Sequence, residues 1–180
     1  RRPPRSTLFP YTTRFRSEVA AAAKAQIDKV VHSCAYVYHS IPVADLAEKL
    51  AEVTPGRLQK TFFGNGGAEA NEGAMRMAKQ FTKRTEFIAL QGSFHGRSLA
   101  TLSITGNKDR KKGGGPYASG ISFHPSAYCY RCPYAMSYPA CDMYCAKQLE
   151  RTIQFDTAGD VAAFIADTMM GEGGIIIPPK

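Results

Sequence analysis

An apolar pair that stops at glycines and leads directly into a helix-forming segment constrains this chain more than any other feature. Phe62 and Phe63 precede Gly64, and the stretch from Asn65 to Glu72 reads Asn-Gly-Gly-Ala-Glu-Ala-Asn-Glu. A short strand, a turn with free backbone N–H groups and a helix N-terminus form a natural binding site for a phosphate group. The turn matches neither a Walker A loop nor Gly-x-Gly-x-x-Gly, so an ordinary tight strand–helix connection is an equal alternative.

Segments with strand character and helix character alternate along the whole chain. Helices are predicted over residues 18–32, 42–54, 68–83, 97–104 and 145–155. Strands are predicted over residues 60–63, 86–90, 121–124 and 161–167. The last of these strands, Val-Ala-Ala-Phe-Ile-Ala-Asp, suits the buried middle of a sheet. Strands that alternate with helices predict an α/β layered domain with a largely parallel sheet.

The basic charge of the chain is not arranged as in a nucleic-acid-binding protein. The formal net charge is +8, and five of these charges come from arginines in the first 17 residues, which contain no acid. The loop segment 108–112 adds a further +3, so the rest of the chain is balanced. A nucleic-acid-binding protein needs a basic stripe along one face. We therefore expect no nucleic-acid partner.

The two ends of the chain look unlike the middle. Residues 1–17 mix Pro, Thr, Arg and aromatic residues without helical or strand period, so a non-native or disordered head is expected there and the domain is assigned to residues 18–180. The apolar run 175–177 close to the last residue suggests truncation. There is no apolar run of the roughly 18 residues that a membrane helix needs, and no signal peptide. We expect a cytoplasmic protein with no membrane partner.

A second loop, Gln91-Gly92-Ser93-Phe94-His95-Gly96-Arg97 (the aromatic loop), follows the next predicted strand. In a parallel strand pair both loops lie at the carboxyl edge of the sheet, where α/β proteins bind ligands. Phe94 can stack on a flat heteroaromatic ring, and Arg97 can bind a carboxylate through two hydrogen bonds. Each residue also has a simpler interpretation: a core position for Phe94, a structural role for His95 and a solvated side chain for Arg97. Each simpler interpretation is favoured for its residue alone, but the joint placement of the three favours a ligand site.

Three ordered motifs carry a resemblance to a known family. Residues 63–72, residues 94–97 and Gly-Glu-Gly-Gly at 171–174 with Pro178 resemble the class III aminotransferases, pyridoxal-phosphate enzymes of fold type I such as 4-aminobutyrate, acetylornithine and ornithine aminotransferases. The resemblance covers residues 18–180 in one register. It implies the first half of the large cofactor-binding domain, a mostly parallel sheet flanked by helices, and pyridoxal 5'-phosphate as cofactor.

The resemblance also implies the reaction and the roles of individual residues. The full-length enzyme would be a homodimer that transfers an amino group from an amino acid, ω-amino acids included, to a 2-oxo acid. The backbone of Gly67 and Ala68 would bind the cofactor phosphate, and Phe94 would stack on its pyridine ring. Arg97 resembles the arginine that binds the substrate carboxylate. Glu172 resembles a gate glutamate that pairs with a later arginine and so admits two kinds of substrate.

Three departures from the family pattern affect these expectations. Gly66 stands where many members have Ser, which removes a side chain but no backbone donor. Asp167-Thr168 stands where the family usually has Glu-Pro, so the charge is kept while the reach and the rigid turn change. The family's Schiff-base lysine and its aspartate on the pyridine nitrogen lie beyond residue 180. We therefore expect an inactive fragment. An amino-acid racemase of the same family is the nearest alternative.

Four cysteines within 17 residues form the remaining motif: Cys129, Cys132, Cys141 and Cys145. Four thiolates at short spacing suit a tetrahedral zinc site, but only one Cys-x-x-Cys pair is present. Unpaired or buried thiols are the favoured interpretation, so no metal ligand is assigned, and disulfides are not expected in the cytosol. A small four-cysteine metal-binding interaction module is the alternative from another class of protein, and the long α/β alternation argues against it.

Overall fold

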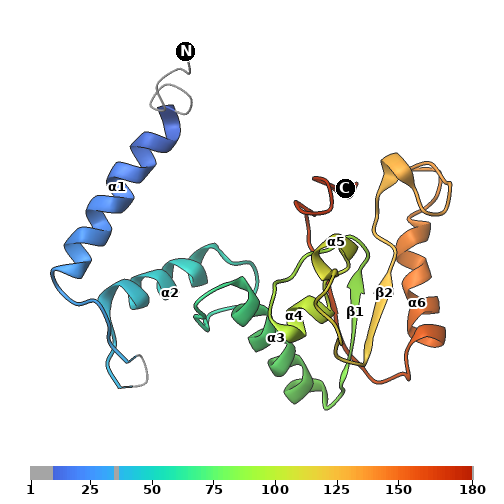
Figure 1. Cartoon of the computed structure of the whole chain (residues 1–180), viewed down its shortest axis with the longest axis horizontal. Coiled ribbons are helices and arrows are strands. Elements are labelled where there is room, and N and C mark those ends of the chain that lie inside the picture. Colours follow the sequence, from blue (N-terminus) through green and yellow to red (C-terminus); the bar gives the residue numbers. More distant parts are fainter. Residues whose placement is uncertain (1–9, 35–36, 180) are drawn as a thin grey trace. The chain divides into compact units, whose positions relative to one another are not determined.

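The computed structural model describes residues 10–34 and 37–179, and the chain divides into two units, residues 1–61 and 62–180 (Figure 1). The first unit contains α1 (Pro10–Ile27) and α2 (Ile41–Val53). Helix α1 begins at Pro10, earlier than the sequence predicts, so it includes part of the segment assigned to the head. A proline is tolerated in the first turn of a helix. Residues 1–9 of that head lie outside the described residues.

Helix α2 agrees with its sequence prediction. Pro42 lies in its first turn, and the helix ends at Val53, before Pro55 and Gly56. None of its residues is buried, and Val43 and Leu46 are 43% and 49% exposed. Its apolar stripe is therefore only partly covered by the residues that the structure describes, with Ala47 and Leu50 half-buried.

The second unit contains a sheet of three strands. Its elements are α3 (Gly67–Thr82), β1 (Glu86–Leu90), α4 (Leu99–Ser103), α5 (Lys108–Lys111), β2 (Ile121–His124), a 3₁₀ turn η1 (Cys129–Arg131), α6 (Tyr144–Asp156) and β3 (Val161–Ile165). The strand order is β2-β1-β3, and both pairings are parallel. Helices α3 and α4 lie on one side of the sheet and α6 on the other (Figure 1). The predicted α/β fold with a parallel sheet is confirmed.

The central strand β1 provides half of the buried hydrophobic residues of this unit. Phe87 and Ala89 pack with Met75 of α3 and with Ile104. Full burial of a side chain such as Phe87 stabilises the fold by about 1.5–3 kcal/mol. Successive residues of β1 point to opposite faces of the sheet. All four residues after Glu86 are buried, so both faces of the sheet are covered at this strand.

Two strand predictions need correction. Strand β3 was expected in the buried middle of the sheet, but among the described strands it lies at the edge, and Phe164 is 43% exposed. An apolar run cannot tell a central strand from an edge strand, because both bury at least one face. Residues 60–63 form no strand, because no described segment pairs with them, and Phe62 and Phe63 are 58% and 41% exposed.

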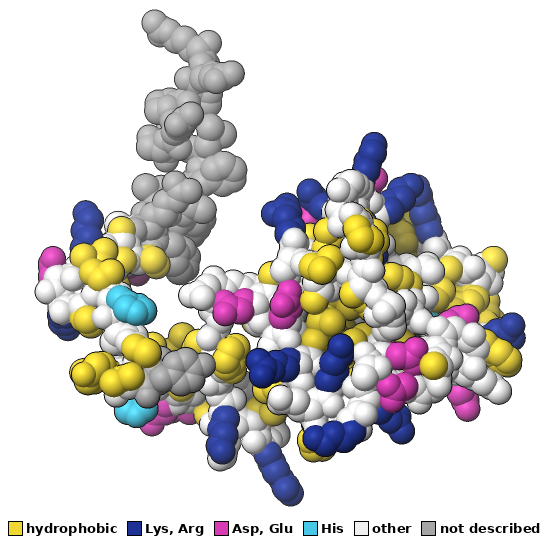
Figure 2. All heavy atoms as spheres, turned by 60° about the horizontal axis from the view of Figure 1, so that its bottom comes forward, with side chains coloured by type: hydrophobic (Ala, Val, Ile, Leu, Met, Phe, Trp, Pro, Cys, Tyr) yellow, Lys and Arg dark blue, Asp and Glu magenta, His cyan; other side chains and the backbone are white. Residues whose placement is uncertain are grey.

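The surface agrees with the charge distribution of the sequence. On the face of the second unit that Figure 2 shows, Lys and Arg side chains are scattered among acidic and hydrophobic ones and form no continuous stripe. In the described part of the chain, no helix combines the length and the apolar character that crossing a membrane requires.

Candidate functional site

The N-terminus of α3 offers unpaired backbone donors to an anion. Gly66 caps the helix in an extended conformation, with φ −177° and ψ 172°. The first N–H groups of an α-helix have no partner within the helix. A Cβ placed on Gly66 or Gly67 would meet no heavy atom within 4 Å, so the space beside this turn is open. The donors, the positive end of the helix dipole and the open space together suit a phosphate group.

Glu69 holds the approach to this helix in place. Its Oε2 accepts hydrogen bonds from the backbone N of Asn65 at 2.6 Å and from Nδ2 of Asn65 at 3.0 Å. The carboxylate reaches back from the first helical turn, much as the acidic residue of a capping box does. The conformation of the glycine turn (residues 64–67) is therefore held from inside the helix.

The aromatic loop starts at the carboxyl end of β1 and is tied down by Ser93. This serine is fully buried, and its Oγ donates to the carbonyl of Leu90 at 2.6 Å. The same Oγ accepts from the backbone N of Gly106 at 3.2 Å, and the carbonyl of Ser93 accepts from the backbone N of Asn107 at 3.0 Å. These bonds fix the loop against the segment that follows α4.

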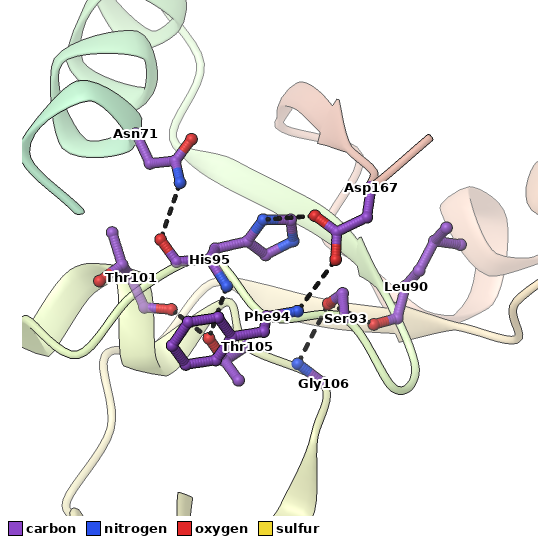
Figure 3. A network of polar contacts seen from close by, with 9 residues as sticks. All are labelled: Asn71, Leu90, Ser93, Phe94, His95, Thr101, Thr105, Gly106 and Asp167. Atoms are coloured by element: carbon purple, nitrogen blue, oxygen red, sulfur yellow. Dashed lines mark hydrogen bonds and ion pairs between the residues drawn. The ribbon is translucent and has the colours of Figure 1, made fainter. Parts of the chain in front are cut away.

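His95 connects the aromatic loop to α3. Its carbonyl accepts from Nδ2 of Asn71 on α3 at 2.7 Å, and its backbone N donates to Oγ1 of Thr105 at 3.1 Å (Figure 3). Thr105 Oγ1 in turn donates to the carbonyl of Thr101 at 2.8 Å. The main chain of His95 is therefore hydrogen-bonded on both sides, to two different parts of the unit.

Asp167, two residues after β3, binds two successive residues of the aromatic loop (Figure 3). Its Oδ2 accepts from the backbone N of Phe94 at 3.0 Å, and its Oδ1 lies 3.5 Å from Nδ1 of His95. The contact is possible because β1 and β3 are parallel, which puts their carboxyl ends at one edge of the sheet. The shorter acid in place of the family's glutamate thus reaches the loop.

Burial determines the charge state of His95. The residue is 6% exposed, and its pKa is lowered from the ordinary value by burial, which outweighs the opposing attraction of Asp167. Nε2 is buried without a hydrogen-bond partner in the described part of the chain. A neutral imidazole that faces a carboxylate through Nδ1 carries its proton there, so Nε2 is left as an acceptor.

The glycine turn and the aromatic loop meet at Gly96. This glycine has φ +143°, and a Cβ on it would lie 2.8 Å from Cβ of Ala68 and 2.5 Å from Oγ1 of Thr101. The sequence predicted that the two loops would lie together because their strands pair. They do lie together, but the packing of α3 against the aromatic loop joins them, since residues 60–63 form no strand.

Phe94 and Arg97 lie next to each other in this loop. The guanidinium carbon of Arg97 is 5.7 Å from the centroid of the Phe94 ring. Phe94 is half-buried and Arg97 is exposed. The guanidinium lies over one face of the ring, so a flat ligand would have to stack on the opposite face.

Glu172 is paired within the chain. Its Oε2 accepts from Nε of Arg110 at 2.8 Å and also from the terminal NH2 of Arg110, and its carbonyl accepts from Nδ2 of Asn107 at 3.2 Å. The sequence led us to expect a later arginine as its partner, and Arg110 was not singled out. In the sequence, only the basic character of segment 108–112 indicates Arg110. The spacing between Arg110 and Glu172 in the sequence does not indicate that the two residues pair.

The four cysteines surround one small cavity, which is also lined by aromatic residues such as Tyr134 and Tyr144. All four are unpaired; Cys129 is exposed and the other three are half-buried. The interpretation as thiols that hold no metal stays a prediction, and none of the four is a buried core residue. No three His, Cys, Asp or Glu side chains in the described ranges are arranged to hold a metal ion.

Comparison with known proteins defines the family. The model of the family described as aminotransferase class-III matches residues 15–180. The chain belongs to the class III aminotransferases, and this family membership implies pyridoxal phosphate as cofactor.

Several curated relatives have names that agree with this family. An acetylornithine aminotransferase from Methanothermobacter thermautotrophicus is 36% identical over 91% of this chain and 36% of its own length. A probable 4-aminobutyrate aminotransferase from Bacillus subtilis is 34% identical over 91% of this chain and 38% of its own. A leucine/methionine racemase from Thermococcus litoralis is 30% identical over 91% and 37%. The chain thus spans a little over a third of the length of these relatives.

Solved structures support the fold assignment. An (S)-enantioselective ω-transaminase from Thermomicrobium roseum superposes with a TM-score of 0.82 at 32% identity, over 91% of this chain and 38% of the transaminase. An amine transaminase from an uncultivated Pseudomonas species, solved with pyridoxal phosphate bound, gives the same TM-score and identity over 91% and 39%. The three-stranded sheet with its helices therefore matches part of each transaminase chain.

Proposed function

We propose that this chain supplies the phosphate-binding part of the cofactor site in an aminotransferase that moves an amino group from an amino acid to a 2-oxo acid. One observation carries the proposal: Gly96 packs against Ala68, which brings the aromatic loop to the N-terminus of α3. An anion site and an aromatic platform then lie side by side, as a phosphorylated aromatic cofactor requires.

The residues present fit pyridoxal phosphate. The backbone donors of Gly67 and Ala68 lie in the first turn of a 16-residue helix, next to the open space beside Gly66 and Gly67, where the phosphate would bind. One face of Phe94 would support the pyridine ring. When bound, the cofactor supplies an electron sink for the bonds at the amino-bearing carbon of the substrate. The role of this chain is to bind the cofactor and orient it.

Arg97 and Glu172 are proposed to recognise the substrate. Arg97 is exposed beside Phe94 and would bind a carboxylate through its planar donor fork. Glu172 would act as the gate that neutralises an arginine when a carboxylate is absent. In this chain Glu172 already has a cationic partner, Arg110, which would compete for it. The gate would therefore depend on the balance between two arginines.

We also propose that the 180 residues alone are catalytically silent. The relatives are nearly three times as long as the stretch that matches. By the family resemblance, the Schiff-base lysine and the pyridine-nitrogen aspartate would lie outside this stretch. Pyridoxal phosphate incubated with the 180-residue chain should give no visible absorption band that borohydride abolishes. Such a band would contradict this part of the proposal.

Assembly, compartment and partners are proposed on the same basis. We propose a homodimer, because hydrophobic side chains such as Phe81, 90% exposed, need a cover that the described residues do not provide. Free cysteines throughout favour the cytoplasm. The scattered basic side chains in Figure 2 favour the absence of a nucleic-acid partner. A four-cysteine interaction module is disfavoured, because the parallel sheet and the family match account for nearly the whole chain.

A racemase is the second candidate, since a leucine/methionine racemase is among the relatives. The two activities are separated by incubating the intact protein with pyridoxal phosphate and a single L-amino acid, with and without an added 2-oxo acid as amino acceptor. Transamination consumes a 2-oxo acid and produces a second amino acid, whereas racemisation produces the D-enantiomer without any 2-oxo acid. We expect transamination. D-enantiomer as the main product would favour the racemase.

A further inference from the structure

We propose that Asp167 is a positioning residue that sets the orientation of Phe94, the ring on which the cofactor would stack. The inference rests on the proposed function, since it assigns Phe94 to the cofactor. Asp167 touches no substrate in this scheme. It acts through the main chain of Phe94 and through the side chain of His95.

The contacts of Asp167 have the form of a two-point clamp. One carboxylate oxygen accepts from the backbone N of Phe94 at 3.0 Å, and the other lies 3.5 Å from Nδ1 of His95. A planar group held at both oxygens cannot rotate freely. Phe94 and His95 are consecutive, so the clamp fixes the backbone from which the Phe94 ring projects (Figure 3).

The other anchors of this loop act on Ser93 and His95, the two neighbours of Phe94. Asn71 binds the carbonyl of His95, and Thr105 binds its backbone N. The backbone N of Phe94 is committed to Asp167. Loss of Asp167 would therefore leave the loop attached through Ser93 and His95, while the backbone N of Phe94 between them loses its partner.

An ionised carboxylate also selects one tautomer of His95. It only accepts hydrogen bonds, so Nδ1 of the neutral imidazole must carry the proton, and Nε2 is left as the buried acceptor. An asparagine at position 167 has one acceptor oxygen and one NH2 group. If the oxygen keeps the bond to Phe94, the NH2 faces His95 and drives the proton to Nε2. The clamp therefore has a spectroscopic signature that a merely space-filling residue lacks.

The experiment uses the intact protein and three variants. Asp167→Asn removes the charge and one acceptor, and Asp167→Glu keeps an acceptor-only carboxylate. Asp160→Asn is the matched control: Asp160 Oδ2 accepts from the backbone N of Thr85 at 3.0 Å and from Oγ1 of Thr85 at 2.7 Å, at the amino ends of the same two strands. The readouts are the ¹⁵N shifts of the His95 imidazole without cofactor, and the induced circular dichroism and affinity of added pyridoxal phosphate.

In Asp167→Asn we expect the His95 proton on Nε2, a reduced induced circular dichroism and an affinity for pyridoxal phosphate about tenfold lower, the scale set by losing a hydrogen bond to a charged group. Asp167→Glu should restore the tautomer and most of the dichroism, and Asp160→Asn should change neither. Unchanged dichroism and tautomer in Asp167→Asn overturn the inference. If Asp167→Asn does not fold, the wild type and Asp167→Glu decide. A wild-type His95 protonated on Nε2 overturns the inference. A wild-type His95 protonated on Nδ1, together with the same tautomer and most of the dichroism in Asp167→Glu, supports the inference. A wild-type protein that binds no pyridoxal phosphate contradicts the proposed function itself.

Discussion

Gly96 lies so close to Ala68 that a Cβ on Gly96 would come within 2.8 Å of the alanine methyl carbon. This contact joins the aromatic loop to the first turn of α3. It leaves no room for a larger residue at either position. The spacing between the anion site and Phe94 is therefore set by two small residues that lie 28 positions apart in the sequence.

Gly96→Ala should destabilise the protein and weaken cofactor binding together. The new methyl group would clash with Thr101 and Ala68, and φ +143° is strained for any residue with a Cβ. We expect a loss of about 1–3 kcal/mol in the free energy of unfolding, as for other overpacked sites. Urea unfolding measures it. Gly171→Ala is the control, because a Cβ on Gly171 meets nothing within 4 Å; an equal loss in both variants would contradict the packing argument.

His95 should make stability depend on pH. Burial lowers the pKa of His95 in the folded protein. Below the ordinary histidine pKa of about 6.5, His95 therefore binds a proton in the unfolded chain before it does so in the folded chain. The stability contributed by neutral His95 is complete above that value and is lost as the pH falls below it. The urea midpoint should fall between about pH 7.5 and about pH 5, a range that brackets this pKa, and it should fall less steeply in His95→Gln. The exposed His39 serves as the control residue; a slope that His39→Gln reduces equally would contradict the assignment.

The ion pair of Glu172 and Arg110 should contribute little stability. Both side chains are more than 40% exposed, and exposed pairs contribute about 0–1 kcal/mol. Arg110→Gln should therefore leave the urea midpoint almost unchanged. If Glu172 is the gate, the same variant should change the relative KM values for monocarboxylate and dicarboxylate substrates in the intact enzyme. Lys108→Gln, in the same short helix, is the control for the loss of one positive charge.

The four thiols around the cavity should react readily in the reduced protein. Cys129 is exposed and Cys132, Cys141 and Cys145 are half-buried. We expect all four to be labelled by a maleimide under native conditions. Labelling of Cys129 should be slower than its exposure suggests, because desolvation and the neighbouring thiols raise its pKa and so lower its thiolate fraction. Mass spectrometry after timed labelling measures this. Protection of all four, together with stoichiometric zinc by metal analysis, would contradict the free-thiol assignment.

The sequence predicted most elements of the second unit, because their signals are local, but it took the segment of the short helix α5 as a loop. The helical period of α3, the apolar β1 and the glycines before α3 all act within a few residues. The parallel sheet follows from their alternation. The sequence also singled out Phe94 and the glycine turn, since aromatic and glycine residues after strands are a local pattern.

Long-range contacts could not be predicted in the same way. The bond between Asp167 and Phe94 joins residues 73 positions apart, and the pair of Arg110 and Glu172 joins residues 62 apart. Such contacts depend on how strands and turns assemble. The edge position of β3 and the unpaired residues 60–63 have the same origin, because strand neighbours are set by the whole sheet.

The central claim is that the backbone of Gly67 and Ala68 at the start of α3 binds the phosphate of pyridoxal phosphate. Gly67→Asp puts a negative side chain into the open space beside these donors, and Ala44→Asp on the exposed surface of α2 is the control with the same added charge. The most direct measurement is the affinity of the intact protein for pyridoxal phosphate and for pyridoxal, which lacks the phosphate. We predict that the wild type and Ala44→Asp prefer the phosphorylated form, and that Gly67→Asp loses this preference while it still binds pyridoxal. A preference retained in full by Gly67→Asp would contradict the account.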